Sequence, residues 1–364
     1  MGGLMQTPHI AGDAVRKPIA RIPVRVRAGR TAGAVVGVGA AVAVLVAAVP
    51  ATAVGHASGQ ASGQAVGKSS QRTETPRLKV LTYNAFLMSR SLYPNWGQDH
   101  RAQAIPAADF FQGQDVVVLQ EAFDNSSSEA LKRNAADRYP HQTPVVGRSR
   151  SGWDATGGAY SATTPEDGGV TLLSKWPIVR QEQYVYPDAC GSDAYSNKGF
   201  LYAVLDVHGT KVHIVGTHTQ STDSGCGEGE AVADRAAQFR QIDAFLDAKH
   251  IPSDEQVMLA GDLNVDSHGD EYGSMLANAG AVPADARTGH PYSFDTDENS
   301  IAAERYPDDP SEDLDHVLHR RGHARPDNWR NHVVKERSEP WTVSSWGKDY
   351  TYVNLSDHYP LTAG

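Results

Sequence analysis

Short apolar runs of strand length recur along the chain after residue 77. They are rich in β-branched and aromatic residues and are bounded by turn-forming residues, which is typical of β-strands. The runs cover residues 78–83, 115–119, 169–173, 200–207, 211–217, 256–260 and 314–319. The runs 200–207 and 211–217 are joined by His208-Gly209-Thr210, so they are predicted to pair as an antiparallel hairpin.

Two further segments have the spacing of helices. Residues 101–111 form one candidate, and Pro106 is expected to end or kink it. Between residues 228 and 250, apolar side chains recur as on the buried face of a helix: Val232, Ala236, Phe239, Ile242, Phe245 and Leu246. Because strands outnumber helices and one strand pair is antiparallel, the pattern predicts a mixed α/β sandwich.

The N-terminal part has the pattern of an export signal. Residues 1–57 contain a basic stretch, the uncharged segment 31–49 and a tail of small residues that suits signal-peptidase cleavage. The alternative is a retained membrane anchor, since 31–49 approaches the length of about 20 residues that spans a bilayer. Residues 58–76, rich in Ser, Gly and Gln, are predicted to form a disordered leader. A secreted, extracellular protein is expected.

The remaining residues 77–364 are within the size range of one large α/β domain and show no internal repeat. Without residues 1–57, which hold six Lys/Arg and one Asp, the chain has 27 Lys/Arg and 42 Asp/Glu, a formal charge of −15. This composition argues against a broad basic surface, so no nucleic-acid partner is expected. No protein partner is implied, and a monomer is expected.

Two cysteines lie after the signal, Cys190 and Cys226, both in Gly-rich sequence. An even number of cysteines in an exported protein favours a disulfide bond. The alternative, a cysteine-based zinc site, lacks the CxxC spacing that such sites favour. A disulfide between Cys190 and Cys226 is therefore predicted.

Short polar motifs close several of the apolar runs. In chain order they are Thr82-Tyr83-Asn84, Leu119-Gln120-Glu121, Gly216-Thr217-His218-Thr219, Gly261-Asp262-Leu263-Asn264 and Ser356-Asp357-His358. Each motif alone is ordinary. As an ordered set at strand ends, they can meet at one edge of a sheet and form a metal-assisted site that cleaves phosphoesters.

The residue types in this set suit Mg²⁺. Glu121 closes a strand that has the pattern of a buried one, where a carboxylate is costly unless it is exposed, paired or bound to metal. One carboxylate from Glu121 and one amide from Asn84 are the hard oxygen donors that Mg²⁺ prefers. Mg²⁺ is therefore the expected ion, with Mn²⁺ or Co²⁺ as alternatives. Zinc is less favoured because the sequence has no cluster of His or Cys ligands.

The pair Asp262 and Asn264 has two interpretations. Asp262 can orient or deprotonate a water while the Asn264 amide donates to a phosphoryl oxygen, or the pair forms an ordinary Asx turn. The other motifs favour the chemical interpretation. His218 and His358 are candidates for proton transfer or for stabilising a phosphoryl oxygen, and Asp315 on the run 314–319 can orient His358.

This set of motifs resembles the endonuclease/exonuclease/phosphatase superfamily, whose DNase I-like fold is a four-layer sandwich of two mixed β-sheets flanked by helices. Within the superfamily, longer stretches are similar to the secreted bacterial sphingomyelinases C. These stretches are residues 119–125, 146–154, 165–170, 196–200, 216–220 and 350–360. The resemblance extends from about Leu78 to Thr362, which is the whole predicted domain.

The resemblance implies a Mg²⁺-dependent phosphodiesterase that cleaves sphingomyelin to ceramide and phosphocholine. It implies one Mg²⁺ near Glu121 and a second, edge metal bound by Asn125, Glu166 and Asp167. From the residues alone, Glu166-Asp167 is equally a solvated acidic turn. The predicted disulfide also matches the family.

The expected mechanism assigns a role to each motif. His358, oriented by Asp315 and assisted by Asp262, deprotonates a water for in-line attack on phosphorus. The metal at Glu121 stabilises the leaving alkoxide, and Asn264 and His218 hold the phosphoryl oxygens.

The expected partner is a membrane surface that contains sphingomyelin. Related enzymes place two adjacent aromatic residues at the tip of a hairpin that contacts the membrane, whereas here Trp346 is followed by Gly347. A type II′ turn at Gly347-Lys348 would place Trp346 beside the tip. Trp346 is therefore expected to contact the membrane, and the alternative is a Trp that folds back onto the domain.

Two other classes of function share parts of this pattern. A secreted nuclease or phosphatase is the first, because one fold supports several substrates. A lipid-binding module without catalysis is the second, although a binding module needs no general base.

Overall fold

The computed structural model describes residues 75–345 and 347–364. The predictions for the signal 1–57, for most of the leader 58–76 and for Trp346 lie outside the described residues. In the described part of the chain, none of the helices combines the length and the apolar composition needed to cross a membrane.

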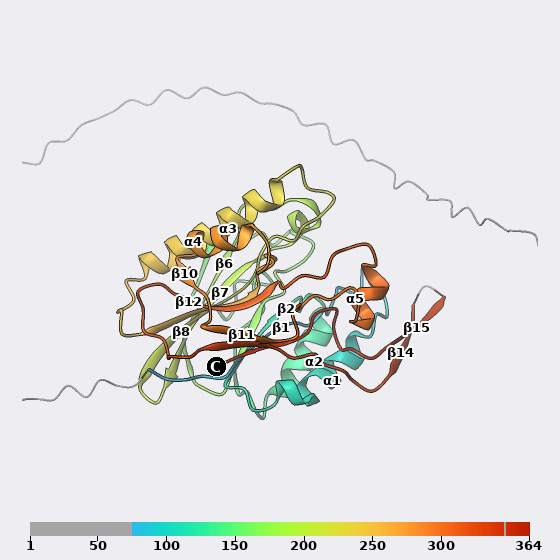
Figure 1. The fold of residues 1–364 in the computed structure, drawn as a ribbon, viewed down its shortest axis with the longest axis horizontal. Coiled ribbons are helices and arrows are strands. Elements are labelled where there is room, and N and C mark those ends of the chain that lie inside the picture. The colour runs from blue at the N-terminus through green and yellow to red at the C-terminus, as the bar shows by residue number, and fades with distance from the viewer. Residues whose placement is uncertain (1–74, 346) are drawn as a thin grey trace, which may run out of the picture. The chain divides into compact units, whose positions relative to one another are not determined.

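Two seven-stranded mixed sheets form the centre of the domain (Figure 1). In spatial order, the first sheet contains β11 (Ala286–Gly289), β13 (Arg330–Val333), β16 (Leu361–Ala363), β1 (Val80–Asn84), β2 (Val116–Gln120), β5 (Thr171–Ser174) and β3 (His141–Gln142). The second contains β10 (Ala281–Val282), β12 (Asp315–Arg320), β9 (Gln256–Asp262), β8 (Thr210–His218), β7 (Gly199–Val207), β6 (Ile178–Val185) and β4 (Ala155–Gly158). A separate hairpin is made of β14 (Trp341–Ser345) and β15 (Lys348–Tyr352).

Helices cover the outer faces of both sheets (Figure 1). The longer ones are α1 (Gln98–Ala107), α2 (Asn125–Ala135), α3 (Glu230–Ala248) and α4 (Glu271–Asn278), and shorter ones are α5 (Ser300–Arg305) and the 3₁₀ helices η1 (Asp109–Phe111) and η2 (Gly191–Tyr195). α1 and α2 share a core with the first sheet, and α3 and α4 share one with the second. The predicted four-layer DNase I-like sandwich is therefore confirmed.

The central strands show why the sequence contains continuous apolar runs. In β2, Val116 and Val118 join the core between the two sheets, whereas Val117 and Leu119 join the core beneath α1 and α2. Alternate residues of a strand point to opposite faces of its sheet, so a strand covered on both faces needs apolar residues at every position.

Every predicted strand is present, with ends shifted by at most two residues. The predicted hairpin is β7 and β8, in which Val207 pairs with Thr210. Its loop therefore contains only His208 and Gly209, with φ of 53° and 86°. Two successive positive φ values are the signature of a type I′ turn, whose twist matches that of the flanking strands.

The two predicted helices are also present. The candidate at 228–250 is α3, and the candidate at 101–111 is divided into α1 and η1. The division follows Pro106, which has no N–H to donate to the preceding turn. The sequence analysis did not predict α2, α4 and α5, because these helices are short and rich in polar residues.

The predicted turn of the β14–β15 hairpin is wrong by one residue. Ser345 pairs with Lys348, so the connection consists of residues 346 and 347. Gly347, with a φ of 77°, occupies the second central position. A type II′ turn at Gly347-Lys348 requires positive φ at its first central residue and requires Lys348 in the turn, but Lys348 begins β15.

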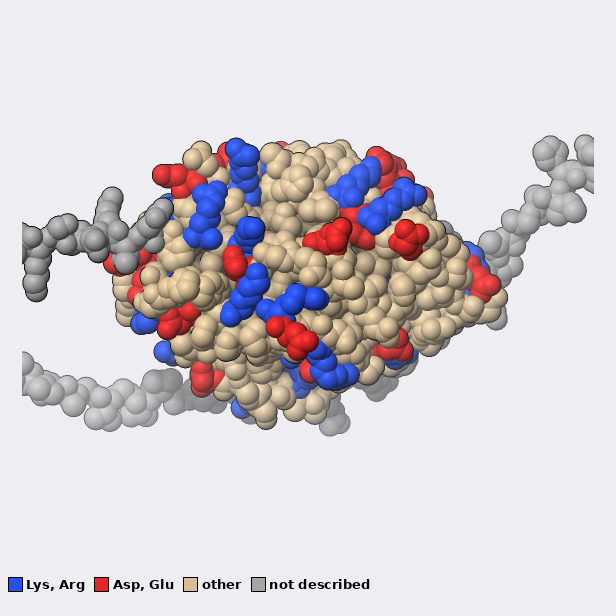
Figure 2. Space-filling view, turned by 90° about the horizontal axis from the view of Figure 1, so that it is seen from below, with Lys and Arg blue, Asp and Glu red and all other residues tan. Residues whose placement is uncertain are grey.

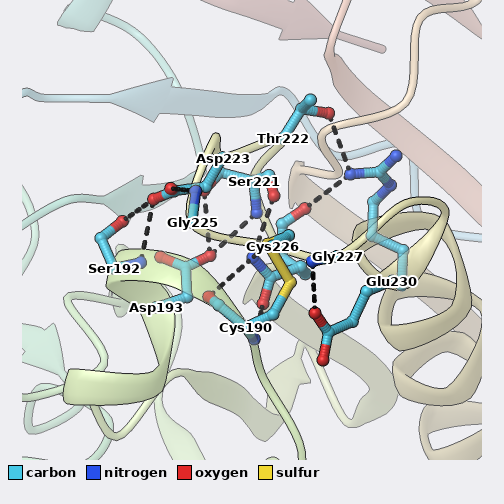
Figure 3. The surroundings of a disulfide bond; sticks show 12 residues. Cys190, Ser192, Asp193, Ser221, Thr222, Asp223, Gly225, Cys226, Gly227 and Glu230 are labelled. Atoms are coloured by element: carbon cyan, nitrogen blue, oxygen red, sulfur yellow. Dashed lines mark hydrogen bonds between the residues drawn. A yellow bond between two sulfur atoms is a disulfide. The ribbon is translucent and has the colours of Figure 1, made fainter. Parts of the chain in front are cut away.

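The predicted disulfide joins Cys190 to Cys226 and closes a loop with a sequence separation of 36 (Figure 3). Hydrogen bonds on both sides of it connect the same two segments. Asp193 Oδ2 accepts from the Ser221 N–H at 2.8 Å, and Asp223 Oδ2 accepts from the Ser192 N–H at 2.9 Å. The disulfide therefore fastens η2 to the loop that follows β8.

Loss of this disulfide is expected to destabilise the domain. Replacing both cysteines by Ser should lower the free energy of unfolding by about 3–4 kcal/mol, because the open loop adds entropy to the unfolded chain. The melting temperature should fall on the order of 5–10 °C, as measured by circular dichroism. A reducing agent should produce the same shift in wild type and none in the double variant. Two free thiols by intact-mass measurement of non-reduced wild type would contradict the disulfide.

Candidate active site

The ends of three neighbouring strands bring the predicted residues of the second sheet together. His218 pairs with Asp262 across β8 and β9, and Asp315 pairs with Asp262 across β9 and β12. Neighbouring strands lie about 4.8 Å apart. Residues separated by 97 positions in sequence therefore become neighbours at one edge of the sheet.

The first sheet contributes Asn84 and Glu121 to the same edge. β1 and β2 are parallel, and Asn84 pairs with Gln120, so Glu121 follows directly. Asn84 Nδ2 donates to Asp262 Oδ2 at 3.1 Å and thereby joins the two sheets. The Asn84 carbonyl oxygen Oδ1 accepts from the Phe86 N–H at 3.1 Å. The Asn84 side chain thus binds Asp262 directly and positions this carboxylate.

His358 and Asp315 form the predicted pair. The His358 Nδ1 atom lies 2.8 Å from Asp315 Oδ2, and the opposite ring nitrogen, Nε2, lies 3.7 Å from Asp262 Oδ2. Burial alone would lower the pKa of His358. The neighbouring carboxylates of Asp315, Asp262 and Asp357 outweigh burial and raise this pKa to about 10.

His218 has a different electrostatic environment. Burial, followed by the positive charge of Lys198, lowers the pKa of His218 to about 4. Lys198 Nζ lies 3.3 Å from the His218 Nε2 atom, so the neutral imidazole accepts a hydrogen bond from the ammonium group. The structure disfavours a charged His218, because a buried cation already lies beside the ring.

Lys198 is a site residue that the sequence analysis did not identify. Its side chain is buried, and Nζ lies 2.8 Å from Asp193 Oδ2. Both residues line the pocket that contains His218 and Asp262. No periodicity in the sequence marks them, since they lie in η2 and in the turn before β7. The available signal was the stretch 196–200, one of those similar to the sphingomyelinases C, which contains Lys198.

Glu121 has the surroundings of a cation ligand. The carboxylate oxygen Oε2 is buried and has no hydrogen-bond partner among the described residues. Burial, and next the negative charge of Asp357, raise the pKa of Glu121 to about 7. A buried carboxylate beside a second negative charge favours a bound cation. Glu121 therefore fits the role of a divalent-metal ligand, and Asp357 lines the same pocket.

The pocket around these residues has a volume of about 430 Å³. Its charged part contains Glu121, Asp262 and His358, and its wall carries the apolar and aromatic side chains of Met88, Tyr93, Phe123, Phe294, Tyr306 and Leu314. The pocket can therefore hold a ligand with one charged and one apolar part.

Asn264 combines both interpretations of its motif. Its N–H donates to Asp262 Oδ1 at 3.0 Å, which is an Asx turn. Its side chain nevertheless lines the pocket, while Nδ2 donates to the Thr219 carbonyl at 2.9 Å. The turn leaves Asp262 Oδ2 directed toward Asn84 and the histidines, so the turn itself orients the carboxylate.

The three residues of the expected edge site line a second pocket, of about 330 Å³. Asn125 begins α2, and Glu166 and Asp167 lie in the loop before β5. Arg148 Nε donates to Asp167 Oδ2 at 2.7 Å. The structure thus brings Asn125, Glu166 and Asp167 together, with Asp167 held by an arginine.

The sequence and structure comparisons agree with one another. Residues 81–358 match the Endonuclease/Exonuclease/phosphatase family. Sphingomyelinase C of Bacillus cereus is 46% identical over 294 residues, covering 79% of this chain and 88% of that protein.

Solved structures show the same relationship. Sphingomyelinase C from Streptomyces griseocarneus is 76% identical, with a TM-score of 0.79 over 80% of this chain and 99% of that chain. A beta toxin from Staphylococcus aureus with bound magnesium ions is 44% identical, with a TM-score of 0.78 over 79% of this chain and 99% of that chain. The chain therefore belongs to the endonuclease/exonuclease/phosphatase family and, within it, to the sphingomyelinases C.

Proposed function

We propose that this protein hydrolyses sphingomyelin to ceramide and phosphocholine. The observation that carries the proposal is the convergence of Glu121, His218, Asp262 and His358 in one pocket at the end of both sheets. The identity of 46% to a protein named sphingomyelinase C supports the substrate.

The pocket wall suits the two ends of this substrate. Aromatic side chains such as Tyr93, Phe123 and Tyr306 can face a quaternary ammonium group, which binds to the electron-rich faces of rings. Acidic side chains at the mouth, Asp309 and Glu312, add a favourable negative charge. The apolar surface of the wall favours the ceramide part.

His358 and Asp315 perform the proton transfer in this proposal. A water attacks phosphorus in line with the bond to the ceramide oxygen, and the neutral His358 imidazole accepts its proton at Nε2. Asp315, at 2.8 Å from Nδ1, keeps the ring oriented and stabilises the imidazolium that forms. Asp262, which faces Nε2 at 3.7 Å, orients the attacking water.

Other polar side chains of the same pocket hold the phosphoryl group. Asn264 and the Lys198 ammonium group provide donors, and neutral His218 helps to hold the phosphoryl group by positioning Lys198 without adding negative charge. A Mg²⁺ held by Glu121 and Asn84, with Asp357 lining the same pocket, would when bound neutralise the developing charge and oppose the carboxylates that raise the pKa of His358.

Three further features belong to the proposal. A second metal at Asn125, Glu166 and Asp167 would stabilise the adjoining loops. Trp346, at the tip of the β14–β15 hairpin sequence, would contact the membrane. Residues 1–57 would direct secretion as a signal peptide, which suits both the disulfide and a membrane substrate outside the cell.

The surface charge supports a lipid rather than a nucleic-acid substrate. In Figure 2, Lys and Arg side chains lie beside Asp and Glu side chains on the face shown. The chain has 33 Lys and Arg against 43 Asp and Glu. Nucleic-acid binding typically needs a continuous basic surface.

The substrate is tested by product analysis. The protein is expected to release phosphocholine and ceramide from sphingomyelin vesicles. EDTA should stop this hydrolysis, and added Mg²⁺ should restore it. Plasmid DNA under the same conditions should remain intact. Cleavage of DNA without release of phosphocholine would identify a nuclease, and vesicle binding without product would identify a lipid-binding module.

His358→Ala and Asp262→Ala should each lower kcat by at least about 10²-fold, the contribution typical of general base catalysis. A matched control is His213→Ala. His213 is also buried on the second sheet and lies 2.6 Å from a carboxylate, that of Glu255, but it is outside the pocket. The control should lose stability but keep kcat in the folded protein. Near wild-type turnover in folded His358→Ala would remove His358 from the mechanism.

Glu121→Gln should nearly abolish Mg²⁺-dependent activity, whereas Asn125→Ala, Glu166→Gln and Asp167→Asn should reduce it in part. The reason is that a metal held by Glu121 would lie in the pocket of the reacting phosphoryl group, whereas Asn125, Glu166 and Asp167 line a separate pocket. Glu336→Gln is the control, since burial raises the pKa of this carboxyl also to about 7 but it lies outside the pocket. Mg²⁺ titrations of activity test the difference. Equal, total losses at both sites would show that the two metals have the same role.

A further inference from the structure

Large apolar side chains exposed to solvent are few in the described part of the chain. They are Leu92 at 59% exposure, Val179 at 56%, Tyr195 at 67% and Val232 at 46%. Leu92 precedes Tyr93, and Tyr195 follows two residues after Asp193; both Tyr93 and Asp193 line the pocket. Single exposed apolar residues are normal on a protein surface, so their position relative to the pocket is the informative property.

Leu92 lies in the loop between β1 and α1. Met88 and Tyr93 of the same loop line the pocket wall. The loop is fixed to the β14–β15 hairpin, because Asn95 Nδ2 donates to the Ser344 carbonyl at 2.5 Å and Ser345 Oγ donates to the Pro94 carbonyl at 2.7 Å. Leu92 is therefore carried on a loop whose position depends on the hairpin.

Tyr195 is the last residue of η2. Ser192 and Asp193 of the same short helix line the pocket. η2 is held in place by the adjoining disulfide at Cys190 and by the ion pair between Asp193 and Lys198. The Tyr195 carbonyl also accepts from the Glu166 N–H at 3.1 Å. The ring is thus exposed on a firmly anchored backbone.

We propose that Leu92 and Tyr195, each on a segment that lines the pocket, insert into the surface of a lipid bilayer. This inference rests on the proposed function, because a substrate embedded in a bilayer reaches the pocket only if the pocket mouth lies against that bilayer. Leu is apolar, and Tyr has an apolar ring and a polar hydroxyl, the pattern found where side chains enter the headgroup region. The occupant of this surface is therefore lipid, and contact with it removes both side chains from water.

Substitutions that remove the apolar groups test the proposal. Leu92→Ser and Tyr195→Ser should each weaken binding to sphingomyelin/phosphatidylcholine vesicles by about fivefold to tenfold, because each loses the apolar area that the lipid would cover. Binding is measured by vesicle flotation in EDTA, so that it does not depend on hydrolysis. Tyr195→Phe keeps the ring and should retain binding.

Val179→Ser is the matched control. Val179 is about as exposed as Leu92, but it lies on β6 beside residues that pair with Val204 and Leu205 of β7. This end of β7 is the one remote from the active site. This variant should bind vesicles as wild type does. All variants should melt within a few degrees of wild type and hydrolyse a short-chain sphingomyelin analogue, kept below its micelle concentration, at the wild-type rate.

Two results would overturn the proposal. One is unchanged vesicle binding in the Leu92→Ser/Tyr195→Ser double variant, which would show that these two side chains do not contact the bilayer. The other is an equal loss of rate on vesicles and on the soluble analogue, which would show damage to the site. Failure of the proposed function would be recognised separately, as a wild-type protein that hydrolyses neither form of sphingomyelin.

Discussion

The negative charge of Asp262, buried where the two sheets meet, is the constraint on which the site depends. A buried carboxylate is costly unless it is hydrogen-bonded and its charge is balanced. Here Asn84 Nδ2 donates to Oδ2 at 3.1 Å, the Asn264 N–H donates to Oδ1 at 3.0 Å, and His358 lies 3.7 Å from Oδ2. These partners come from β1, from the turn after β9 and from the C-terminal segment. Stabilising one charge therefore assembles the site from distant parts of the chain.

The packing of the sheets makes this arrangement precise. The core between them is filled by residues of both sheets, including Val118 of β2, Ile214 of β8 and Met258 of β9. Because close-packed cores transmit displacement, a change in the separation of the sheets would alter the contact between Asn84 and Asp262. The pairing of β8, β9 and β12 places His218, Asp262 and Asp315 directly beside one another across the sheet. Three groups of the site are thus placed on paired strands, whereas His358 lies in the segment before β16.

The substrate-facing wall is built differently. Met88, Tyr93 and Phe123 lie on loops, and η2 is held by the Cys190–Cys226 disulfide and the Asp193–Lys198 ion pair. Loops can vary in sequence without disturbing the sheets. This division explains how a fold shared with phosphatases and nucleases can accept a membrane lipid: the strand ends keep the chemistry, and the loops decide what approaches it.

The sequence by itself determined the elements with a strong local signal. Continuous apolar runs identified the strands, the two cysteines predicted the disulfide, and polar residues after strands identified Asn84, Glu121, His218, Asp262 and His358. Other features are decided by contacts between distant residues. Lys198 lies beside His218 only because β7 and β8 pair. The pKa values of His218 and His358 follow from the charges that surround each ring. The turn at Gly347 follows from the pairing of Ser345 with Lys348. Local sequence encodes which face of a strand is buried, whereas the pKa values and the neighbours at a strand end depend on atoms that only the folded chain brings within a few ångströms.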